Sequence, residues 1–341
     1  MPESEIFHHS KGEFSGEIEI VRIENEALRL SFLADKGADL VEIYYKPKKV
    51  NLAWQSPQGY PTKKTSENYT ANFESFIDSY PGGWQSIFPN GGAPSTFEGV
   101  DFSQHDEVAL LPWKYEFILN NKNEISVKFF LKTKKINCYY EKIYTLKKNS
   151  STIFLSEKIT NLSDKQISAM WGNHVTFGHP FLDNKTFIKI DSKCLVRPHS
   201  VEISSAGRRL GSTLDFIWPK SISDSGSLID FSLIPAKGTK SEMLYIFNFD
   251  NAEYQILSPT NGLSIKLSWD KTVFPYLWYW QEFGGASDYP WFGKAYVIGL
   301  EPFSSYPTNG LAEAVSNGSA LVFKPNETKN SEMKYQILEL A

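Results

Sequence analysis

The stretch 17-EIEIVRIENEALRLSFLADKGADLVEIYY-45 contains the pattern that decides the fold. Apolar and polar residues alternate over residues 17–23 and again over 27–33, so the apolar side chains of each segment share one face. The three polar residues between the segments, 24–26, form a short connection that suits a hairpin. The pattern therefore predicts two neighbouring strands that each bury one face.

The same alternation returns along the rest of the chain. A turn around Gly37, whose φ can be positive, leads to a strand at 40–45. Gly, Asn, Asp and Pro separate the later segments, and long segments of helical period are absent. Further strands are predicted at 125–133, 139–146, 152–160, 243–249, 253–258, 263–269 and 295–301. This arrangement predicts an all-β fold, a sandwich or barrel, rather than alternating βαβ units.

Two polar segments interrupt the strands. Residues 55–80 and the Ser/Gly-rich residues 200–230 are expected to be long loops over a sheet, where β proteins often build the walls of binding sites. The sequence has no internal repeat and no low-complexity linker. A division near residue 160 stays open, and one continuous domain over residues 1–341 is the simpler expectation.

Composition narrows the class of protein. Lys and Arg number 35 against 39 Asp and Glu, so the sequence lacks the basic excess of a dedicated nucleic-acid binder. Aromatic residues make up 15%, and they either fill a large β core or stack on sugar rings. Residues 1–14 lack the apolar core of a signal peptide, and no stretch reaches transmembrane length. With Cys138 and Cys194 expected to be reduced, we predict a cytoplasmic protein without a membrane partner.

The first region with candidate functional residues spans 80–92, followed by 104–107. Two Gly pairs on either side of Trp84 allow backbone to approach a ligand closely. His105 comes just before the apolar run 108–111, so it is expected at the start of a strand. A histidine in such a place has either a structural or a functional role.

The second region, 170–181, contains two histidines five residues apart. On an extended chain this spacing puts the rings on opposite faces, so only one of them is expected to face a pocket. We select His174, because Asn173 beside it offers a second hydrogen-bonding group. His179 precedes a proline and is expected to support the loop.

The third region is the apolar segment 296–303. Glu301 closes this strand, directly before a proline. If the carboxylate is buried, desolvation raises its pKa towards the range of a general base. The alternative is an exposed glutamate at a strand end.

Other site chemistries have less support. His105, Glu107, His174 and His179 could form a His/carboxylate metal set like that of a cupin, but the closely spaced His-x-His ligands are missing. The sequence also lacks a Gly-x-Ser-x-Gly elbow, a phosphate loop and a dinucleotide fingerprint. We therefore expect neither a metal nor a cofactor, and a cupin-like metalloenzyme is the third interpretation.

Together these regions resemble the aldose 1-epimerase, or galactose mutarotase-like, family. The resemblance covers most of the chain, and four short motifs occur in the order typical of the family. They are Gly37-Ala38 in the first turn, Asn90-Gly91-Gly92 followed by His105-Asp106-Glu107, Asn173-His174 followed by Phe177, and Leu300-Glu301-Pro302. The resemblance implies a large antiparallel β-sandwich of the supersandwich type that acts on a small-molecule sugar as a monomer or homodimer.

The resemblance also implies a reaction and its residues. Anomers interconvert when the pyranose opens to an aldehyde, rotates about C1–C2 and closes again. Glu301 would be the base for the C1 hydroxyl, protonated His174 the acid for the ring oxygen, and His105 a donor that holds the ring. The expected sugar-binding residues are Trp84, Gln85, Asn90, Asn173, Trp280 (or Trp278) and Glu282.

The chain departs from the family in ways that leave the sugar open. Trp84-Gln85-Ser86 stands where the family usually has an arginine, and its sugar-binding aspartate has no clear counterpart, with 269–282 the candidate region. Three arginines, Arg197, Arg208 and Arg209, either meet an anionic sugar or lie on the surface. The alternative function is a non-catalytic carbohydrate-binding protein on the same fold, which would keep the aromatic residues and tolerate the loss of His174 and Glu301.

Overall fold

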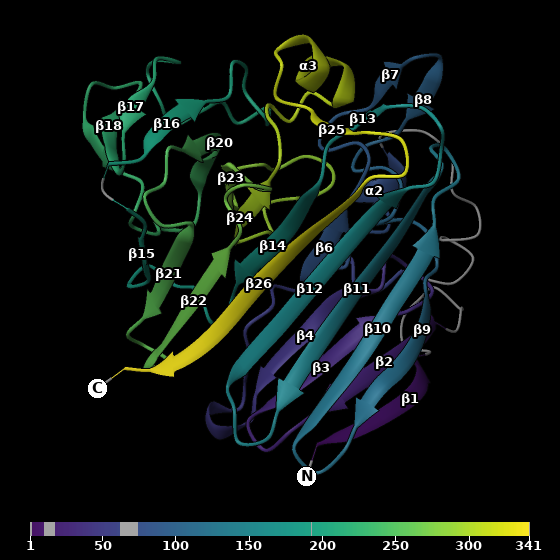
Figure 1. Ribbon diagram of the computed structural model, residues 1–341. Helices are drawn as coiled ribbons and strands as arrows, with labels where there is room; N and C mark the ends of the chain where they lie inside the picture. Colours follow the sequence, from purple (N-terminus) through teal and green to yellow (C-terminus); the bar gives the residue numbers. More distant parts are fainter. Residues whose placement is uncertain (1, 10–17, 62–73, 192, 341) are drawn as a thin grey trace.

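The computed structural model describes residues 2–9, 18–61, 74–191 and 193–340. Two large antiparallel sheets, one twelve-stranded and one eight-stranded, pack face to face as a β-sandwich (Figure 1). The predicted all-β antiparallel sandwich is thus confirmed. Residues 62–73 of the predicted loop at 55–80 lie outside the described residues, and the prediction of a single domain over 1–341 stays a prediction.

The twelve-stranded sheet carries the cavity described below. Its strand order is β1-β2-β3-β4-β6-β14-β24-β23-β20-β16-β17, with β5 paired to β4. The strands are β1 Glu3–His9, β2 Ile18–Glu24, β3 Leu28–Leu33, β4 Asp39–Tyr45, β5 Val50–Asn51, β6 Trp84–Ile87, β14 Gly172–Gly178, β16 Leu195–Pro198, β17 Phe216–Ile217, β20 Thr239–Phe247, β23 Tyr276–Phe283 and β24 Val297–Phe303.

The eight-stranded sheet covers one face of the first sheet. Its order is β15-β21-β22-β26-β12-β11-β10-β9. The strands are β9 Lys114–Asn120, β10 Glu124–Lys132, β11 Cys138–Lys147, β12 Thr152–Asn161, β15 Phe187–Lys189, β21 Glu253–Ser258, β22 Leu263–Trp269 and β26 Thr328–Glu339.

Short elements lie outside the two sheets. They are the pairs β7 Ser95–Phe97 with β8 Val100–Phe102, β13 Ile167–Ala169 with β25 Leu321–Phe323, and β18 Lys220–Ile222 with β19 Leu228–Asp230. Two short α-helices, α2 Glu74–Ile77 and α3 Leu311–Ser316, and the 3-10 turn η1 Lys46–Lys48 complete the described elements. The Ser/Gly-rich region at 200–230 is therefore not one loop, because it contains β17, β18 and β19.

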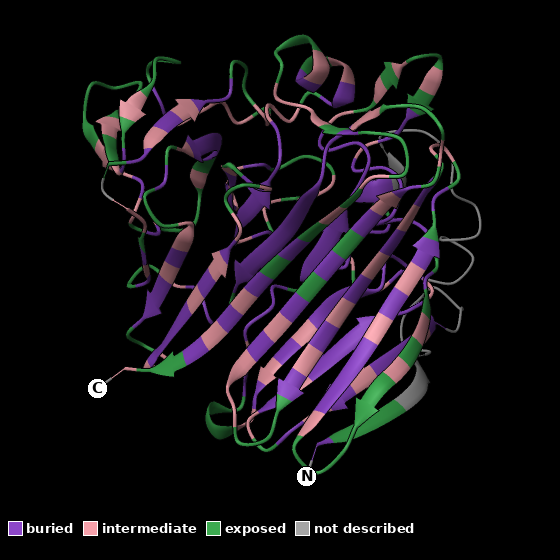
Figure 2. Cartoon of the chain, in the orientation of Figure 1, coloured by how far each residue is buried: buried purple, intermediate pink, exposed green. Residues whose placement is uncertain are grey.

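Burial follows the alternation read from the sequence. In β11, buried residues alternate with half-buried ones, and the bands on β10, β11 and β12 are visible in Figure 2. The buried side chains meet those of the twelve-stranded sheet, and Trp84, Tyr144 and Tyr335 are among the large aromatics of this shared core. These aromatic residues thus fill the β core, the first of the two roles expected for the aromatic content.

Strands β14 and β24 differ, because every one of their residues is buried. One face of each strand meets the sandwich core, where Val175, Phe177 and Leu300 lie. The opposite face meets a second apolar cluster that contains Val297 and Phe303. Because both faces are covered, these strands lack the polar alternation of an exposed strand.

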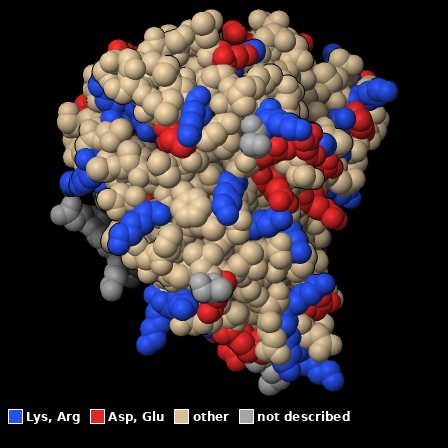
Figure 3. Space-filling model, turned by 90° about the vertical axis from the view of Figure 1, so that its left-hand side faces the viewer, with Lys and Arg blue, Asp and Glu red and all other residues tan. Residues whose placement is uncertain are grey.

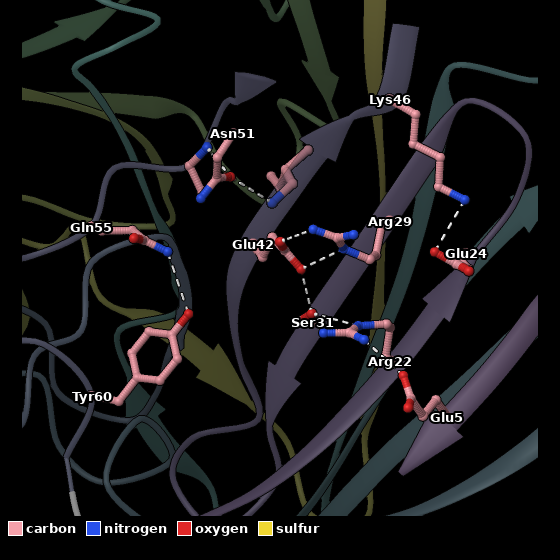
Figure 4. Close-up of polar contacts among 12 residues, drawn as sticks. Glu5, Arg22, Glu24, Arg29, Ser31, Glu42, Lys46, Asn51, Gln55 and Tyr60 are labelled. Carbon is pink, nitrogen blue, oxygen red and sulfur yellow. Dashed lines mark hydrogen bonds and ion pairs between the residues drawn. The ribbon is translucent and has the colours of Figure 1, made fainter. Parts of the chain in front are cut away.

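Polar contacts cover the outer face of the first hairpin. The Arg29 guanidinium donates to both oxygens of Glu42 at 3.1 and 2.7 Å, and the Ser31 hydroxyl donates to the same carboxylate at 2.6 Å (Figure 4). Arg22 forms an ion pair with Glu5 at 2.7 Å. Apart from Glu5 of β1, these residues are polar members of the pattern over 17–45. Because β2 also pairs with β3, the predicted hairpin and its two faces are confirmed.

Two local predictions need correction. The apolar run 108–111 is a series of turns rather than a strand, and His105 lies in a tight turn with a φ of 50°. The second correction is an omission. Several strands of the two sheets were not predicted, and the longest of them is β26, whose twelve residues join β22 to β12 in the eight-stranded sheet. The surface is mixed in charge, with Lys and Arg interspersed with Asp and Glu on the face in Figure 3.

Candidate active site

A cavity of about 470 Å³ lies on the face of the twelve-stranded sheet that turns away from the eight-stranded sheet. This volume is within the range of small-molecule sites. Alternate residues of β14, β20, β23 and β24 form its floor, and the segments before β6, after β8, after β16 and between β23 and β24 form its walls. The floor includes His174, Ser241, Met243, Trp278, Trp280, Glu282 and Glu301, and the walls include Phe76, Tyr80, His105, His199, Glu202, Asp288 and Trp291.

One row of side chains crosses five neighbouring strands at this floor. In register, Gln85 of β6 is opposite His174 of β14, and Glu301 of β24 is opposite Trp278 of β23, which is opposite Tyr245 of β20. The pairs on either side of His174 place it opposite Glu301. Because opposite residues in antiparallel strands lie side by side on one face, the sheet itself brings the histidine and the carboxylate together.

The two predicted catalytic side chains are in direct contact. Nε2 of His174 lies 3.5 Å from Oε1 of Glu301, and both residues are buried. Nδ1 of His174 lies 3.3 Å from the Tyr80 hydroxyl, which orients the ring. Glu301 lies over Gly299, where a Cβ atom would come within 2.2 Å of its Oε1, so the missing side chain leaves room for the carboxylate.

Burial sets the ionisation of this pair. It raises the pKa of Glu301 well above its usual range. Burial, reinforced by the charge of nearby Lys36, lowers the pKa of His174 to about 3. Burial therefore favours a protonated Glu301 beside a neutral His174, the reverse of the predicted resting ionisation. Both arrangements hold one proton, and a single transfer across the contact interconverts them.

His105 completes a cluster of rings in the wall. Its ring centroid is 5.3 Å from that of His174 and 4.6 Å from that of Phe76. The backbone N–H of Gly92 donates to Nδ1 of His105 at 3.2 Å. Since Nδ1 accepts, Nε2 carries the proton of the neutral ring, and burial lowers the pKa of His105 well below its usual range. His105 is thus a neutral hydrogen-bond donor.

Two predicted sugar-binding residues lie outside the cavity, in the core between the two sheets. Trp84 is in the sandwich core, and its Nε1–H donates to Oδ1 of Asn173 at 2.6 Å. Asn173 donates from Nδ2 to buried Glu157 at 2.8 Å. Because successive residues of a strand point to opposite faces, Asn173 turns away from the cavity that His174 enters. Both residues therefore stabilise the contact between the sheets.

Two others support the site from below. Gln85 is fully buried beside His174, and its Nε2 donates to the carbonyl of Gly82. Asn90 donates to the carbonyls of Ala93 and Ser103 at 2.9 and 2.8 Å, and its Oδ1 accepts from the N–H of Leu311 at 2.7 Å. Their amide groups thus join loops and do not line the cavity.

The remaining predicted residues do line the cavity. The Trp280 ring lies 6.1 Å from the His174 ring, and Trp278 stacks on Phe303 at 3.7 Å between centroids. Glu282 also lines the cavity, but its Oε1 accepts the N–H groups of Gly284 and Ala286 at 2.9 and 3.2 Å. This carboxylate therefore holds the loop after β23 as well as facing the cavity.

The set considered for a metal does not converge. Oε1 of Glu107 accepts the backbone N–H groups of Lys134 and Lys135 at 3.0 and 3.1 Å, and His179 is exposed beyond the end of β14. Within the part of the chain that the structure describes, no three His, Cys, Asp or Glu side chains form a group suited to a metal.

The cavity also contains residues that the sequence did not reveal. His199 and Trp291 line it, and neither belongs to a motif of recognisable spacing. Asp270, in the region considered for the missing aspartate, instead accepts from Thr272 in its own turn. His199 is identified by its contact with Tyr245, which is 46 residues away in sequence, so no local sequence pattern indicates its role.

The three arginines considered for an anionic sugar have other partners. Arg197 pairs with Asp215 at 2.6 Å, and Arg208 pairs with Glu242 at 2.9 Å. Arg209 lies over the Phe231 ring at 4.9 Å. None of the three lines the cavity. We also find no helix, within the described ranges, that is long and apolar enough to cross a membrane.

Comparison with known proteins places the fold. Residues 15–207 match the model of a family described as a domain of unknown function (DUF4432). The chain is similar to a Klebsiella pneumoniae protein named as a "putative aldose 1-epimerase", with 16% identity, coverage of 98% of this chain and 84% of that one, and a TM-score of 0.75. A galactose mutarotase-like protein from Clostridium acetobutylicum is 14% identical, with 98% of each chain covered and a TM-score of 0.65. These likenesses show the galactose mutarotase-like fold, and a search of curated proteins finds no match.

Proposed function

The chain belongs to the DUF4432 family, and from that premise we propose that it interconverts the α and β anomers of an uncharged sugar. The observation that carries the proposal is the buried contact of His174 with Glu301 at the floor of the cavity, 3.5 Å apart. A proton donor and a proton acceptor that close to each other can serve two oxygens bound to one sugar carbon. The names of the structural neighbours agree with this chemistry.

Ring opening needs a base for the C1 hydroxyl and an acid for the ring oxygen. In the proposed reaction Glu301 takes the hydroxyl proton while His174 gives its proton to the ring oxygen, and the C1–O5 bond breaks as the C1 carbonyl forms. After rotation about C1–C2 the same two transfers run in reverse, so no proton is gained or lost overall. The reaction starts from the ion-pair form of the single-proton state, and Nε2–H of His105 is a further donor to the ring. No cofactor is needed.

The charge of the cavity supports an uncharged substrate. Besides the protonated Glu301, three carboxylates line it, those of Glu202, Glu282 and Asp288. Among the lining residues that the structure describes, none is Lys or Arg. A phosphate or carboxylate on the sugar would thus meet like charge without a cation to compensate. Trp280 and Trp291 supply the apolar faces on which a sugar ring packs.

The test is a mutarotation assay by polarimetry or NMR over hexoses, pentoses and sugar phosphates. We expect acceleration with one or more free sugars, and a loss of about 10²–10⁴-fold in Glu301→Gln and in His174→Asn. His105→Asn should mainly weaken substrate use. His179→Asn is the matched control, because this histidine is exposed outside the cavity. Full activity in Glu301→Gln or His174→Asn would overturn the assignment, and sugar binding without acceleration would favour the carbohydrate-binding alternative.

The cellular setting is a further part of the proposal. We place the reaction in cytoplasmic carbohydrate metabolism, carried out by a monomer or homodimer. Both cysteines, Cys138 and Cys194, are free and buried, which suits a reducing compartment. Fractionation of cells that express the protein checks the location, and light scattering of the purified protein checks the assembly.

A further inference from the structure

We infer that His199 is a specificity-determining residue whose Nε2–H donates to a hydroxyl group of the bound sugar at the end remote from C1. The inference rests on the proposed function of the cavity, and it extends that function to a residue outside the acid–base pair. His199 follows the last residue of β16, lines the cavity and is 4% exposed.

The hydrogen-bond network fixes which nitrogen of His199 carries the proton. The Tyr245 hydroxyl lies 2.8 Å from Nδ1 of His199 and 2.9 Å from the backbone nitrogen of Thr308. The Thr308 N–H can only donate, so the tyrosine oxygen accepts that bond. A buried hydroxyl proton without an acceptor is costly, and Nδ1 of His199 is its acceptor among the described residues. Nδ1 therefore accepts, and the neutral ring carries its proton on Nε2.

That proton has no partner in the protein as described. Nε2 makes no hydrogen bond to a described residue, yet this atom is not fully enclosed by the protein. Because His199 lines the cavity, Nε2 is open to the cavity. Burial and the charge of Arg208 lower the pKa of His199 to about 4, so the ring is neutral at pH 7. A neutral N–H donor can bind a hydroxyl group without attracting an anion. This suits an uncharged sugar, as do the carboxylates that line the cavity.

The position of His199 defines which part of the sugar it meets. Its backbone N–H donates to the carbonyl of Met243 on β20 at 2.9 Å, and β23 separates β20 from β24, which carries Glu301. Three strand-to-strand steps lead from β24 through β23 and β20 to the end of β16, where His199 lies. At about 4.8 Å a step, the backbones at His199 and Glu301 are roughly 14 Å apart across the sheet. The two side chains thus face the cavity from different ends, and Glu301 marks the end that receives C1.

The first experiment reads the tautomer without any sugar. Nitrogen-15 NMR of histidine-labelled protein, with His199→Gln to assign the resonances, should show Nδ1 unprotonated and Nε2 protonated at pH 7. Tyr245→Phe should lose this preference, because the donor to Nδ1 is gone. A protonated Nδ1 in the wild type would overturn the inference, whether or not the protein proves to be a mutarotase.

The second experiment measures what the donor does. For the sugar found active in the assay above, His199→Leu should raise KM about 10-fold with kcat changed by less than about twofold, as expected for loss of one hydrogen bond made equally in ground and transition states. His199→Gln, whose amide can place an N–H near the position of Nε2, should recover most of the affinity. One monodeoxy sugar should bind the wild type and His199→Leu with equal KM, which identifies the hydroxyl.

The control and the contrary results are distinct. His179→Leu removes an exposed histidine outside the cavity and should leave KM and kcat unchanged. An unchanged KM in His199→Leu, or an equal loss for every deoxy sugar, would overturn the inference. If no sugar is mutarotated, the same variants are compared by calorimetric titration of sugar binding, so failure of the proposed function is separated from failure of the role of His199.

Discussion

Glu107 gives a prediction whose size follows from the structure. Its side chain is fully buried, Oε1 accepts two backbone N–H groups at 3.0 and 3.1 Å, and Oε2 has no partner among the described residues. Burial, reinforced by the charge of Asp106, raises the pKa of Glu107 to about 7. The perturbation is Glu107→Gln, which keeps the shape and an acceptor oxygen but cannot ionise.

The sign and size of the effect follow from proton linkage. Between the unfolded pKa of 4.5 and the folded pKa of about 7, the unfolded chain releases this proton while the folded protein retains it. The free energy of unfolding therefore falls as pH rises through this window. At about 1.4 kcal/mol per pKa unit, the wild type should lose about 2–3 kcal/mol between pH 5 and pH 8 relative to Glu107→Gln.

The assay is urea unfolding followed by tryptophan fluorescence at pH 5 and pH 8 for both proteins. Any constant cost of the new amide cancels, because only the change with pH is compared. Glu98→Gln is the control, since Glu98 is exposed and should give the same pH dependence as the wild type. Parallel pH dependence in the wild type and Glu107→Gln would refute the reasoning, because Glu107 would then titrate alike in both states.

Three further predictions concern the site. Because the pKa of Glu301 is raised and that of His174 is about 3, the pair holds one proton across the neutral range. On the acid side kcat/KM should therefore fall only near pH 3, and a fall near pH 6.5 would contradict this. The fall of kcat/KM on the alkaline side should disappear from the residual activity of Glu301→Gln. Gly299→Ala would bring a Cβ within 2.2 Å of Oε1 of Glu301, so the mutarotation rate should fall by about 10²-fold while circular dichroism retains the β spectrum. Trp84→Phe removes the hydrogen bond to Asn173 in the core, so urea unfolding should show a loss of about 1–3 kcal/mol with KM unchanged; a raised KM would return Trp84 to the site.

The sequence by itself determined the fold class, because a side chain alternates faces along a strand whatever its neighbours are. The alternation over 17–45 predicted β2, β3 and β4 to within a residue or two, and the same is true of β10 to β12, β21 and β22, whereas β20 begins four residues before the predicted start at 243. The spacing of the two histidines predicted that only one of them faces a pocket, and His174 lines the cavity while His179 lies outside it. The reason for selecting His174 was wrong, because Asn173 faces the other sheet. These features are local, since a few consecutive residues are enough to express them.

Only the tertiary structure decided which residues share the cavity. Trp84 and Asn173 belong to the same short motifs as Gln85 and His174, yet they face the other sheet. The sequence could not show this, because β6 and β14 are covered on both sides and apolar content does not mark their core face. The contact of His174 with Glu301 joins residues from two strands far apart in sequence, and it exists because β14 pairs with β24. His199 acquires its role from Tyr245 on the neighbouring strand. Strand pairing creates such contacts, and no single segment contains the information that specifies them.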